Sequence, residues 1–190
     1  TSTIIKALID KEIFEEYYIQ VDRVNFTGKT KEGQLQLSEP QQTAFDGIKQ
    51  SFIDREVCLL HGVTSSGKTE IYIKLIEEYI KEEKQILYLL PEIALTTQLV
   101  GRLRGYFGNR VAVFHSKYSN NERVEVWQQV LEQSPKAQIV IGARSALFLP
   151  FSNLGLIIVD EEHEQTFKQV DPSPRYHARD ASIVLANSHK

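Results

Sequence analysis

Residues 57–69 read Val-Cys-Leu-Leu-His-Gly-Val-Thr-Ser-Ser-Gly-Lys-Thr, which is a short apolar run followed by Gly-x-x-x-x-Gly-Lys-Thr from Gly62 to Thr69. The apolar run Val57–Leu60 has the length and composition of a strand buried on both faces. Apolar side chains recur after Thr69 at helical spacing. A glycine-rich turn between a strand and a helix gathers backbone N–H groups at the positive end of the helix dipole. The stretch therefore predicts a phosphate-binding loop.

The residue types in this loop suit a nucleoside triphosphate and its magnesium ion. Lys68 is expected to reach the β- and γ-phosphates, and Thr69 to place its hydroxyl on Mg²⁺. The alternative is a Gly/Ser-rich turn with a solvated lysine. On the first interpretation ATP and Mg²⁺ are the cofactors, and the loop residues that bind the nucleotide are Gly62, Val63, Thr64, Ser65, Ser66, Gly67, Lys68 and Thr69.

The rest of the chain alternates between apolar runs and helical periodicity. Ser38-Glu-Pro-Gln41 has the spacing of a capping box that opens a helix. A later helical stripe contains Val124, Trp127, Val130 and Leu131, and we expect Trp127 to lie in the core. This alternation predicts an α/β fold with a mostly parallel sheet flanked by helices, and ligands beyond the carboxyl ends of its strands. Strands are expected at Val57–Leu60, Ile86–Leu90, Val111–Phe114, Gln138–Ile141 and Leu154–Val159.

The composition is that of an ordinary globular domain. Of 190 residues, 42% are hydrophobic, and 25 acidic against 22 basic side chains leave a net charge of −3; disordered and disulfide-built proteins are thereby excluded. The single cysteine, Cys58, excludes an internal disulfide and a zinc site of several cysteines, and its apolar neighbours predict a buried, reduced thiol. No apolar run approaches the ~18 residues of a membrane span. We therefore expect a soluble, cytoplasmic protein with no membrane partner.

The slightly negative net charge does not by itself predict a nucleic-acid partner, so such a site has to be a local patch. From Gly101 to Arg123, five basic residues stand against one acidic residue, Glu122. This excess predicts either a surface that follows a phosphate backbone or a solvated helix face.

An acidic motif, Asp160-Glu161-Glu162-His163, comes directly after the last predicted strand. An aspartate at the tip of a strand beside a phosphate loop is placed to bind Mg²⁺, and a neighbouring glutamate to take a proton from water. We assign Asp160 to the metal and Glu161 to the base, so that Lys68, Asp160 and Glu161 are the candidate catalytic residues. His163 is either a contact that relays the state of the nucleotide or an ordinary polar turn residue. Without the phosphate loop, the motif would be interpreted as an acidic surface loop.

A phosphate loop combined with an Asp-Glu-x-His box is typical of superfamily 2 helicases and translocases, and within these the chain resembles the PriA family of bacterial replication-restart helicases. The resemblance implies a RecA-like P-loop domain that is the first motor lobe of an ATP-dependent DNA helicase in replication restart and primosome assembly. It also implies single-stranded and forked DNA, primosome proteins and single-strand-binding proteins as partners. The stretches that support it are Gly62–Tyr72, Leu90–Thr96, Phe114–Ser116, Ile141–Phe148, Val159–His163 and Arg175–Asp180.

The same resemblance implies further site residues. Gln41 is expected to contact adenine, in competition with its role as the capping-box partner of Ser38. Two positions depart from the family pattern: Ser65 stands where glycine is usual, and the expected tryptophan between the two aromatic residues of the loop after the acidic box is missing. The residues expected to contact DNA, through phosphates or by stacking on bases, are Pro91, Thr96, Arg144, Ser145, Phe167 and Tyr176.

The N-terminal region differs in pattern from the rest. By the resemblance, residues 1–26 are the C-terminal remnant of a winged-helix domain, residues 27–36 are a linker and residues 37–190 are the ATP-binding lobe. The chain does not begin with methionine, and it lacks the motifs of a second motor lobe and the cysteine-rich zinc region of the family. We therefore expect a piece of a longer protein, with any zinc bound in the parts that this sequence does not include.

A single lobe is expected to bind nucleotide but to hydrolyse it slowly, because an arginine finger is worth ~10³–10⁵ in rate. Two other functions remain as alternatives. One is the lobe of another superfamily 2 translocase, of the restriction or remodelling type. The other is a nucleotide-gated module that docks a protein partner.

Overall fold

The computed structural model describes residues 30, 31, 33, 35–63, 66–92, 97–115 and 118–189. They contain a four-stranded sheet in the order β2-β3-β1-β4, and every pair of neighbouring strands is parallel. The strands are β1 (Gln85–Leu89), β2 (Val111–Phe114), β3 (Ile139–Gly142) and β4 (Leu154–Val159). The longer helices are α2 (Glu39–Asp54), α3 (Lys68–Lys81), α4 (Thr97–Phe107), α5 (Asn120–Leu131) and α6 (Ala178–Asn187), and the short 3-10 turns are η2 (Gly108–Arg110), η3 (Pro135–Ala137), η4 (Arg144–Phe148) and η5 (Gln165–Phe167). The predicted α/β class with a parallel sheet is confirmed.

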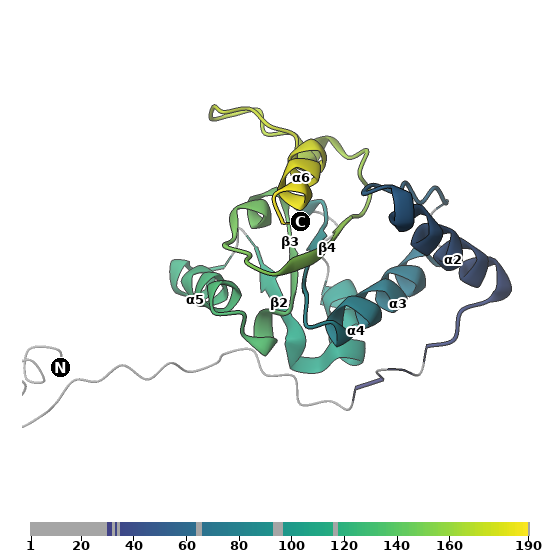
Figure 1. Cartoon of the computed structure of the whole chain (residues 1–190). Helices are drawn as coiled ribbons and strands as arrows, with labels where there is room; N and C mark the ends of the chain where they lie inside the picture. The colour runs from purple at the N-terminus through teal and green to yellow at the C-terminus, as the bar shows by residue number, and fades with distance from the viewer. Residues whose placement is uncertain are drawn as a thin grey trace, which may run out of the picture.

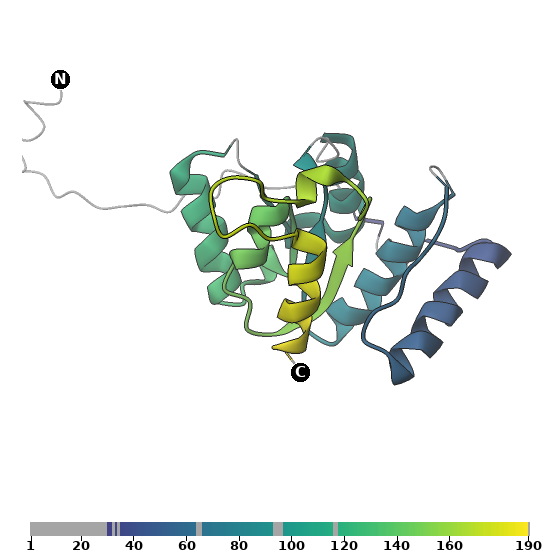
Figure 2. The ribbon, with the colours of Figure 1, turned by 90° about the horizontal axis from the view of Figure 1, so that it is seen from above.

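Both faces of the sheet are covered by helices (Figures 1 and 2). On β1, Ile86 and Tyr88 face one core cluster, which also contains side chains of α2, α3 and α4. Leu87 and Leu89 alternate with them and face a second cluster, which contains side chains of α5 and α6. Because successive side chains of a strand point to opposite faces, a strand that is apolar throughout requires cover on both sides. All five residues of β1 are buried accordingly.

The strand predicted over Val57–Leu60 is wrong. The segment is extended but belongs to no strand, and its side chains alternate: Cys58 and Leu60 are half-buried against the first core cluster, while Val57 and Leu59 are 54% and 73% exposed. A cleft of about 400 Å³ is lined by this segment on one side and by β4 on the other. A short apolar run does not reveal whether its backbone will find a partner strand, and here it packs one face only. Cys58 is accordingly half-buried and not fully buried as predicted.

The helix predicted to open at Ser38 is confirmed. Ser38 and Gln41 form a complete capping box at the start of α2, and Ser119 and Glu122 form another at the start of α5. The core-facing stripe of α5 was assigned to the wrong side, because its buried residues are Val126 and Val130 and Trp127 is 43% exposed. Apolar residues at 124, 126, 127, 130 and 131 define two overlapping stripes, and only packing against β2 selects between them. In the described part of the chain, no helix is long and apolar enough to cross a bilayer.

The predicted winged-helix remnant, residues 1–26, lies outside the described residues, as does most of the predicted linker. The linker residues that are described rest on the lobe. The Lys31 N–H donates to the Gly105 carbonyl at 2.8 Å, and the Gly33 N–H donates to Glu77 Oε1 at 3.1 Å. The end of the linker therefore contacts α3 and α4, and the domain boundaries themselves stay a prediction.

Candidate nucleotide-binding site

The turn into α3 is built around two glycines at which a side chain would press against neighbouring side chains. Gly67 is the N-cap of α3 and has a φ of 84°, in the left-handed region that favours glycine. A Cβ on Gly67 would collide with Gln41 Nε2, and a Cβ on Gly62 would lie 2.8 Å from Ser66 Oγ. Of the predicted loop residues, Thr64 and Ser65 lie outside the described residues, so the effect of Ser65 stays a prediction. The described part of the loop has the close backbone turn that a phosphate cradle requires.

The lysine of the motif lies against its own loop. Lys68 is the first residue of α3, and its Nζ donates to the Gly62 carbonyl at 2.7 Å. The ammonium is therefore held at the positive end of the α3 dipole, over the backbone of the loop. Both features favour an anion at this point.

The acidic motif begins where the sheet ends. The Asp160 N–H donates to the Leu89 carbonyl at 3.0 Å, which extends the β1–β4 ladder by one bond. Asp160 Oδ2 accepts from the Tyr88 hydroxyl at 2.9 Å, and Oδ1 accepts from the Glu161 N–H at 3.1 Å. Burial raises the pKa of Asp160, and the hydrogen bond from Tyr88 acts in the opposite direction. Glu161 has a φ of 52°, so the chain turns sharply directly after the aspartate.

The loop and the acidic motif meet in one cleft. Three residues of this shared cleft also line the larger cleft between residues 58–63 and β4: Lys68, Asp160 and Glu161. The Thr69 hydroxyl and the Asp160 carboxylate are oxygen ligands of the kind that Mg²⁺ takes beside phosphates, so the residues present fit the expected ion. The shared cleft has a volume of about 360 Å³ and is lined by Ser66, Gly67, Lys68, Thr69, Glu70, Arg102, Asp160 and Glu161.

Arg102 is a residue of this cleft that sequence reasoning missed. It comes from α4 and forms an ion pair with Glu70, in the first turn of α3. The basic stretch from Gly101 to Arg123 offered a hint of function, but nothing in its spacing points to the phosphate loop, which lies more than 30 residues earlier. Only the packing of α4 beside α3 brings this arginine to the cleft.

Gln41 completes the capping box of α2, which is one of its two expected roles, and also contacts the phosphate loop. Its Oε1 accepts from the Ser38 N–H at 2.9 Å, which completes the capping box. Its Nε2 donates to the Gly67 carbonyl at 3.3 Å, so the same side chain ties α2 to the phosphate loop. The contact with adenine stays a prediction.

The rest of the acidic box is linked to the last helix. His163 is exposed, and its Nε2 lies 3.8 Å from Glu161 Oε2. Glu162 accepts a hydrogen bond from Arg179 Nη1 at 2.8 Å, and Arg179 Nε also donates to Asp180 at 2.9 Å. The stretch Arg175–Asp180, one of those that support the family resemblance, therefore contacts the acidic box directly. The sequence did not reveal the pairing of Arg179 with Glu162.

Three of the residues expected to contact DNA line a separate cleft. Pro91, Arg144 and Phe167 all line a cleft of about 160 Å³, and Arg144 Nη1 donates to the Lys168 carbonyl at 2.9 Å. Ser145 follows Arg144 in η4 and is half-buried. Thr96 lies outside the described residues.

The two aromatic candidates differ in accessibility. Although Phe167 borders the 160 Å³ cleft, it is 1% exposed and belongs to the second core cluster, so its predicted stacking on a base is wrong in this structure. Tyr176 is half-buried and packs edge-on against Phe148, with ring centroids 5.2 Å apart. A bulky apolar ring after a polar turn can pack in the core or stack on a nucleobase, and only the tertiary packing distinguishes these two roles.

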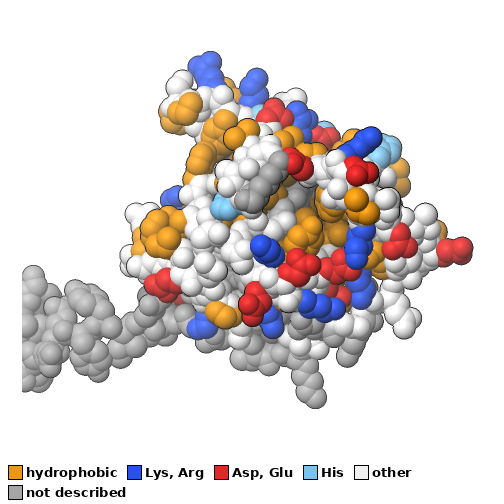
Figure 3. Space-filling view, in the orientation of Figure 1, with side chains coloured by type: hydrophobic (Ala, Val, Ile, Leu, Met, Phe, Trp, Pro, Cys, Tyr) orange, Lys and Arg blue, Asp and Glu red, His pale blue; other side chains and the backbone are white. Residues whose placement is uncertain are grey.

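The charged side chains do not gather into one large basic face on the side seen in Figure 3, where acidic and basic groups are interspersed. Three of the four described arginines of the stretch from Gly101 to Arg123 have partners in different places. Arg102 is paired with Glu70, Arg110 Nη1 donates to Gln138 at 2.9 Å, and the Arg123 guanidinium lies 5.4 Å from the centre of the Phe114 ring. The patch interpretation of this stretch is therefore not favoured by the geometry.

Comparison with known proteins gives a consistent result. The family model described as DEAD/DEAH box helicase matches residues 38–186. Replication restart protein PriA of Bacillus subtilis is 44% identical over 193 residues, which cover 100% of this chain and 24% of that protein. The PriA of Haemophilus influenzae is 45% identical over 195 residues, covering 98% of this chain and 26% of that protein, and the PriA of Synechocystis is 53% identical over 121 residues, covering 64% and 14%.

The chain thus spans about a quarter or less of the length of these curated relatives. The resemblance to PriA that the motifs predicted is confirmed by these identities. Since the family model covers more than half of its length, the chain belongs to the DEAD/DEAH box helicase family.

Proposed function

We propose that the chain is the ATP-binding first motor lobe of an ATP-dependent DNA helicase that acts in replication restart and primosome assembly, in the bacterial cytoplasm at the nucleoid. The observation that supports this most is that the phosphate loop and the acidic pair Asp160 and Glu161 line the same cleft of about 360 Å³. The relatives that bear the name replication restart protein support the assignment of the process. Proposed partners are single-stranded and forked DNA, primosome proteins and single-strand-binding proteins.

The site residues predicted from the sequence each have a role in this proposal. The backbone N–H groups of the loop and the Lys68 ammonium bind the polyphosphate, while the Thr69 hydroxyl and the Asp160 carboxylate hold Mg²⁺, which neutralises charge on the phosphate oxygens. Glu161 accepts a proton from the attacking water. His163, whose Nε2 is 3.8 Å from Glu161 Oε2, is the contact through which the state of the nucleotide reaches the rest of the motor.

In this proposal the single lobe binds the nucleotide, and fast ATP hydrolysis requires a protein with two lobes. A transition state for phosphoryl transfer needs further positive charge, and an arginine finger supplies ~10³–10⁵ in rate. The isolated lobe is therefore expected to bind nucleotide and to hydrolyse it poorly. Zinc is not part of this site in the proposal.

The test is a calorimetric titration of the 190-residue chain with Mg²⁺ and a non-hydrolysable ATP analogue, followed by a titration with a single-stranded oligonucleotide. Binding of the nucleotide with weak binding of DNA is the expected result. In a longer protein that carries both lobes, DNA should stimulate ATP hydrolysis. Nucleotide binding without any DNA-stimulated turnover in the longer protein would instead favour a nucleotide-gated docking module, and no nucleotide binding at all would overturn the proposal.

Replacing Gln41 with alanine is expected to reduce the preference for ATP over GTP about tenfold, which corresponds to the loss of roughly one base-specific hydrogen bond. The capping box is lost at the same time, so the chain should lose about 1 kcal/mol of stability. Competition binding with the two nucleotides measures the first effect, and thermal unfolding measures the second.

The matched control for this variant is Gln42→Ala, because the Gln42 side chain is exposed and donates to Asp46, one turn further along α2. The control should keep the preference for ATP. A Gln41 variant that is destabilised but keeps its nucleotide preference would restrict Gln41 to the capping role.

Replacing Arg144 with alanine is expected to flatten the salt dependence of single-strand binding by about 0.7 in log–log slope, the value for one lost phosphate contact. Arg110→Ala is the matched control, since Arg110 also donates one hydrogen bond to a partner in the lobe but lies before β2, at the edge of the sheet opposite the cleft. Fluorescence titrations in a salt series measure both slopes. Equal slopes for the wild type and Arg144→Ala would restrict this arginine to its bond with Lys168.

A further inference from the structure

The carboxylate of Asp160 is held by two donors of different origin. One is the N–H of the next residue, Glu161, which is available in many turns. The other is the Tyr88 hydroxyl, 2.9 Å from Oδ2, from a strand that lies 72 positions earlier in the chain. A hydrogen bond between residues so far apart in sequence depends on the sheet as a whole, and the phosphate loop plays no part in forming it.

The register of the sheet brings these two side chains together. Tyr88 on β1 is directly opposite Ile158 on β4, and Asp160 lies two residues further along on the same face as Ile158. A diagonal neighbour at this separation is beyond the reach of a short side chain but within reach of an aromatic one. Valine, leucine or phenylalanine at position 88 would keep the strand buried, yet none of them would donate a hydrogen bond to the carboxylate.

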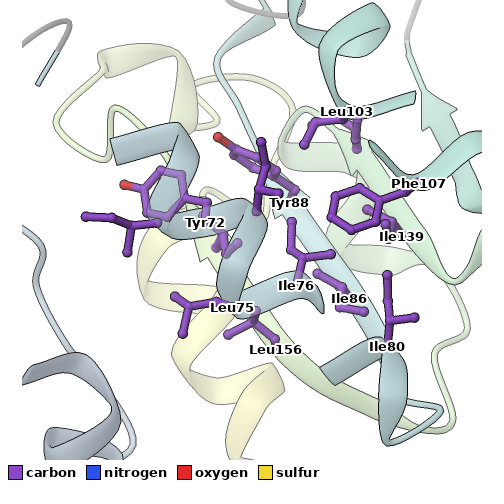
Figure 4. Packing of buried hydrophobic residues seen from close by; sticks show 14 of the residues in the cluster. Tyr72, Leu75, Ile76, Ile80, Ile86, Tyr88, Leu103, Phe107, Ile139 and Leu156 are labelled. Atoms are coloured by element: carbon purple, nitrogen blue, oxygen red, sulfur yellow. The ribbon is translucent and has the colours of Figure 1, made fainter. Parts of the chain in front are cut away.

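The donor is rigid. Tyr88 is 0% exposed, and its ring packs edge-on against Tyr72 of α3, with centroids 5.8 Å apart. Figure 4 shows the ring among the side chains of the first core cluster, beside Tyr72 and Leu103. Any other rotamer would leave a cavity in this cluster, so the hydroxyl is fixed in place by the packing of the whole ring.

We propose that Tyr88 is a positioning residue for the metal-binding carboxylate of Asp160. A carboxylate accepts about four hydrogen bonds; Tyr88 and Glu161 occupy one acceptor position on each oxygen. The remaining positions are thereby directed into the cleft that Asp160 shares with Thr69. This inference rests on the proposed function, in which Asp160 binds the Mg²⁺ of the nucleotide.

The test is Tyr88→Phe in the 190-residue chain, with nucleotide affinity measured across a Mg²⁺ series and again in EDTA, using a non-hydrolysable ATP analogue. Removing a partner that orients a metal ligand typically weakens metal affinity by roughly 10–100-fold. We expect a shift of this size in the Mg²⁺ concentration required for half-maximal enhancement, with unchanged affinity in EDTA. Binding of Mn²⁺ in place of Mg²⁺, followed by electron paramagnetic resonance, should show the same loss without any turnover.

Tyr79→Phe is the matched control, because Tyr79 is a half-buried tyrosine of the same core that lies on α3 away from the cleft. It should leave the Mg²⁺ series unchanged. In an Asp160→Asn background, Tyr88→Phe should cause no further loss of Mg²⁺ affinity. If Tyr88→Phe acted through folding in general, its effect would add to that of Asp160→Asn.

The possible outcomes separate the two proposals. If wild-type nucleotide binding depends on Mg²⁺ and Tyr88→Phe has the wild-type dependence, the role of Tyr88 is wrong and the proposed function stands. If wild-type binding does not respond to Mg²⁺, the proposed function fails and this inference fails with it.

Discussion

Replacing Lys68 with alanine is expected to weaken binding of ATP to this chain by roughly 10²–10⁴-fold. The ammonium is assigned to two phosphates, and each charge-assisted hydrogen bond contributes about 1.5–3 kcal/mol; two such bonds therefore give about 3–6 kcal/mol, and each 1.4 kcal/mol corresponds to a factor of ten in affinity. In the structure Nζ donates to the Gly62 carbonyl at 2.7 Å, so the side chain is already over the loop. Calorimetric titration with a non-hydrolysable analogue measures the loss.

The control is Lys81→Ala, which removes a lysine from the opposite end of the same helix. It should bind the nucleotide like the wild type. Thermal unfolding without nucleotide separates a binding effect from a folding effect, because it measures the stability lost with the bond from Lys68 to Gly62, about 1.5–3 kcal/mol. Unchanged affinity in a folded Lys68→Ala variant would remove the phosphate-loop assignment.

In a protein that carries both motor lobes, Glu161→Gln is expected to lower the rate of ATP hydrolysis by roughly 10²–10⁴-fold while nucleotide binding is retained. This is the usual contribution of a general base, and glutamine has nearly the same shape but cannot take the proton from water. The carboxylate lines the same cleft as Lys68 and Thr69, whereas the Asp160 carboxylate is already engaged by Tyr88. Single-turnover kinetics at saturating ATP measure the chemical step directly.

Glu164→Gln serves as the control for this prediction, because Glu164 lies three residues further along the same turn, where its N–H donates to the Glu161 carbonyl at 2.9 Å. Its turnover should be close to that of the wild type. A normal rate for Glu161→Gln would mean that another group activates the water. Loss of binding together with turnover would place Glu161 in nucleotide binding and not in the chemical step.

Much of this architecture is predictable because it depends on neighbours in the sequence. The strands expected at Val111–Phe114 and Leu154–Val159 coincide with β2 and β4, and the capping box at Ser38 starts α2 as expected. A run of β-branched and apolar residues prefers a buried strand, and a serine with a glutamine three positions later satisfies free N–H groups at a helix start. The loop at Gly62–Thr69 and the acidic box could likewise be found from the sequence, because the residues that define each motif are consecutive.

The other features depend on contacts between segments that are far apart in the sequence. The apolar run Val57–Leu60 and the ring of Phe167 were both misassigned, since their outcome depends on which backbone or core lies next to them. The contact of Gln41 with the phosphate loop and the bond from Tyr88 to Asp160 join residues 26 and 72 positions apart.

The amino-acid sequence by itself therefore determined the α/β class, the phosphate loop and the acidic box. Only the tertiary structure decided how their side chains are held: the order of the parallel strands and the packing of the helices set which donors reach which carboxylate, whereas the hydrophobic pattern of a strand fixes which face is buried and not which strand lies beside it.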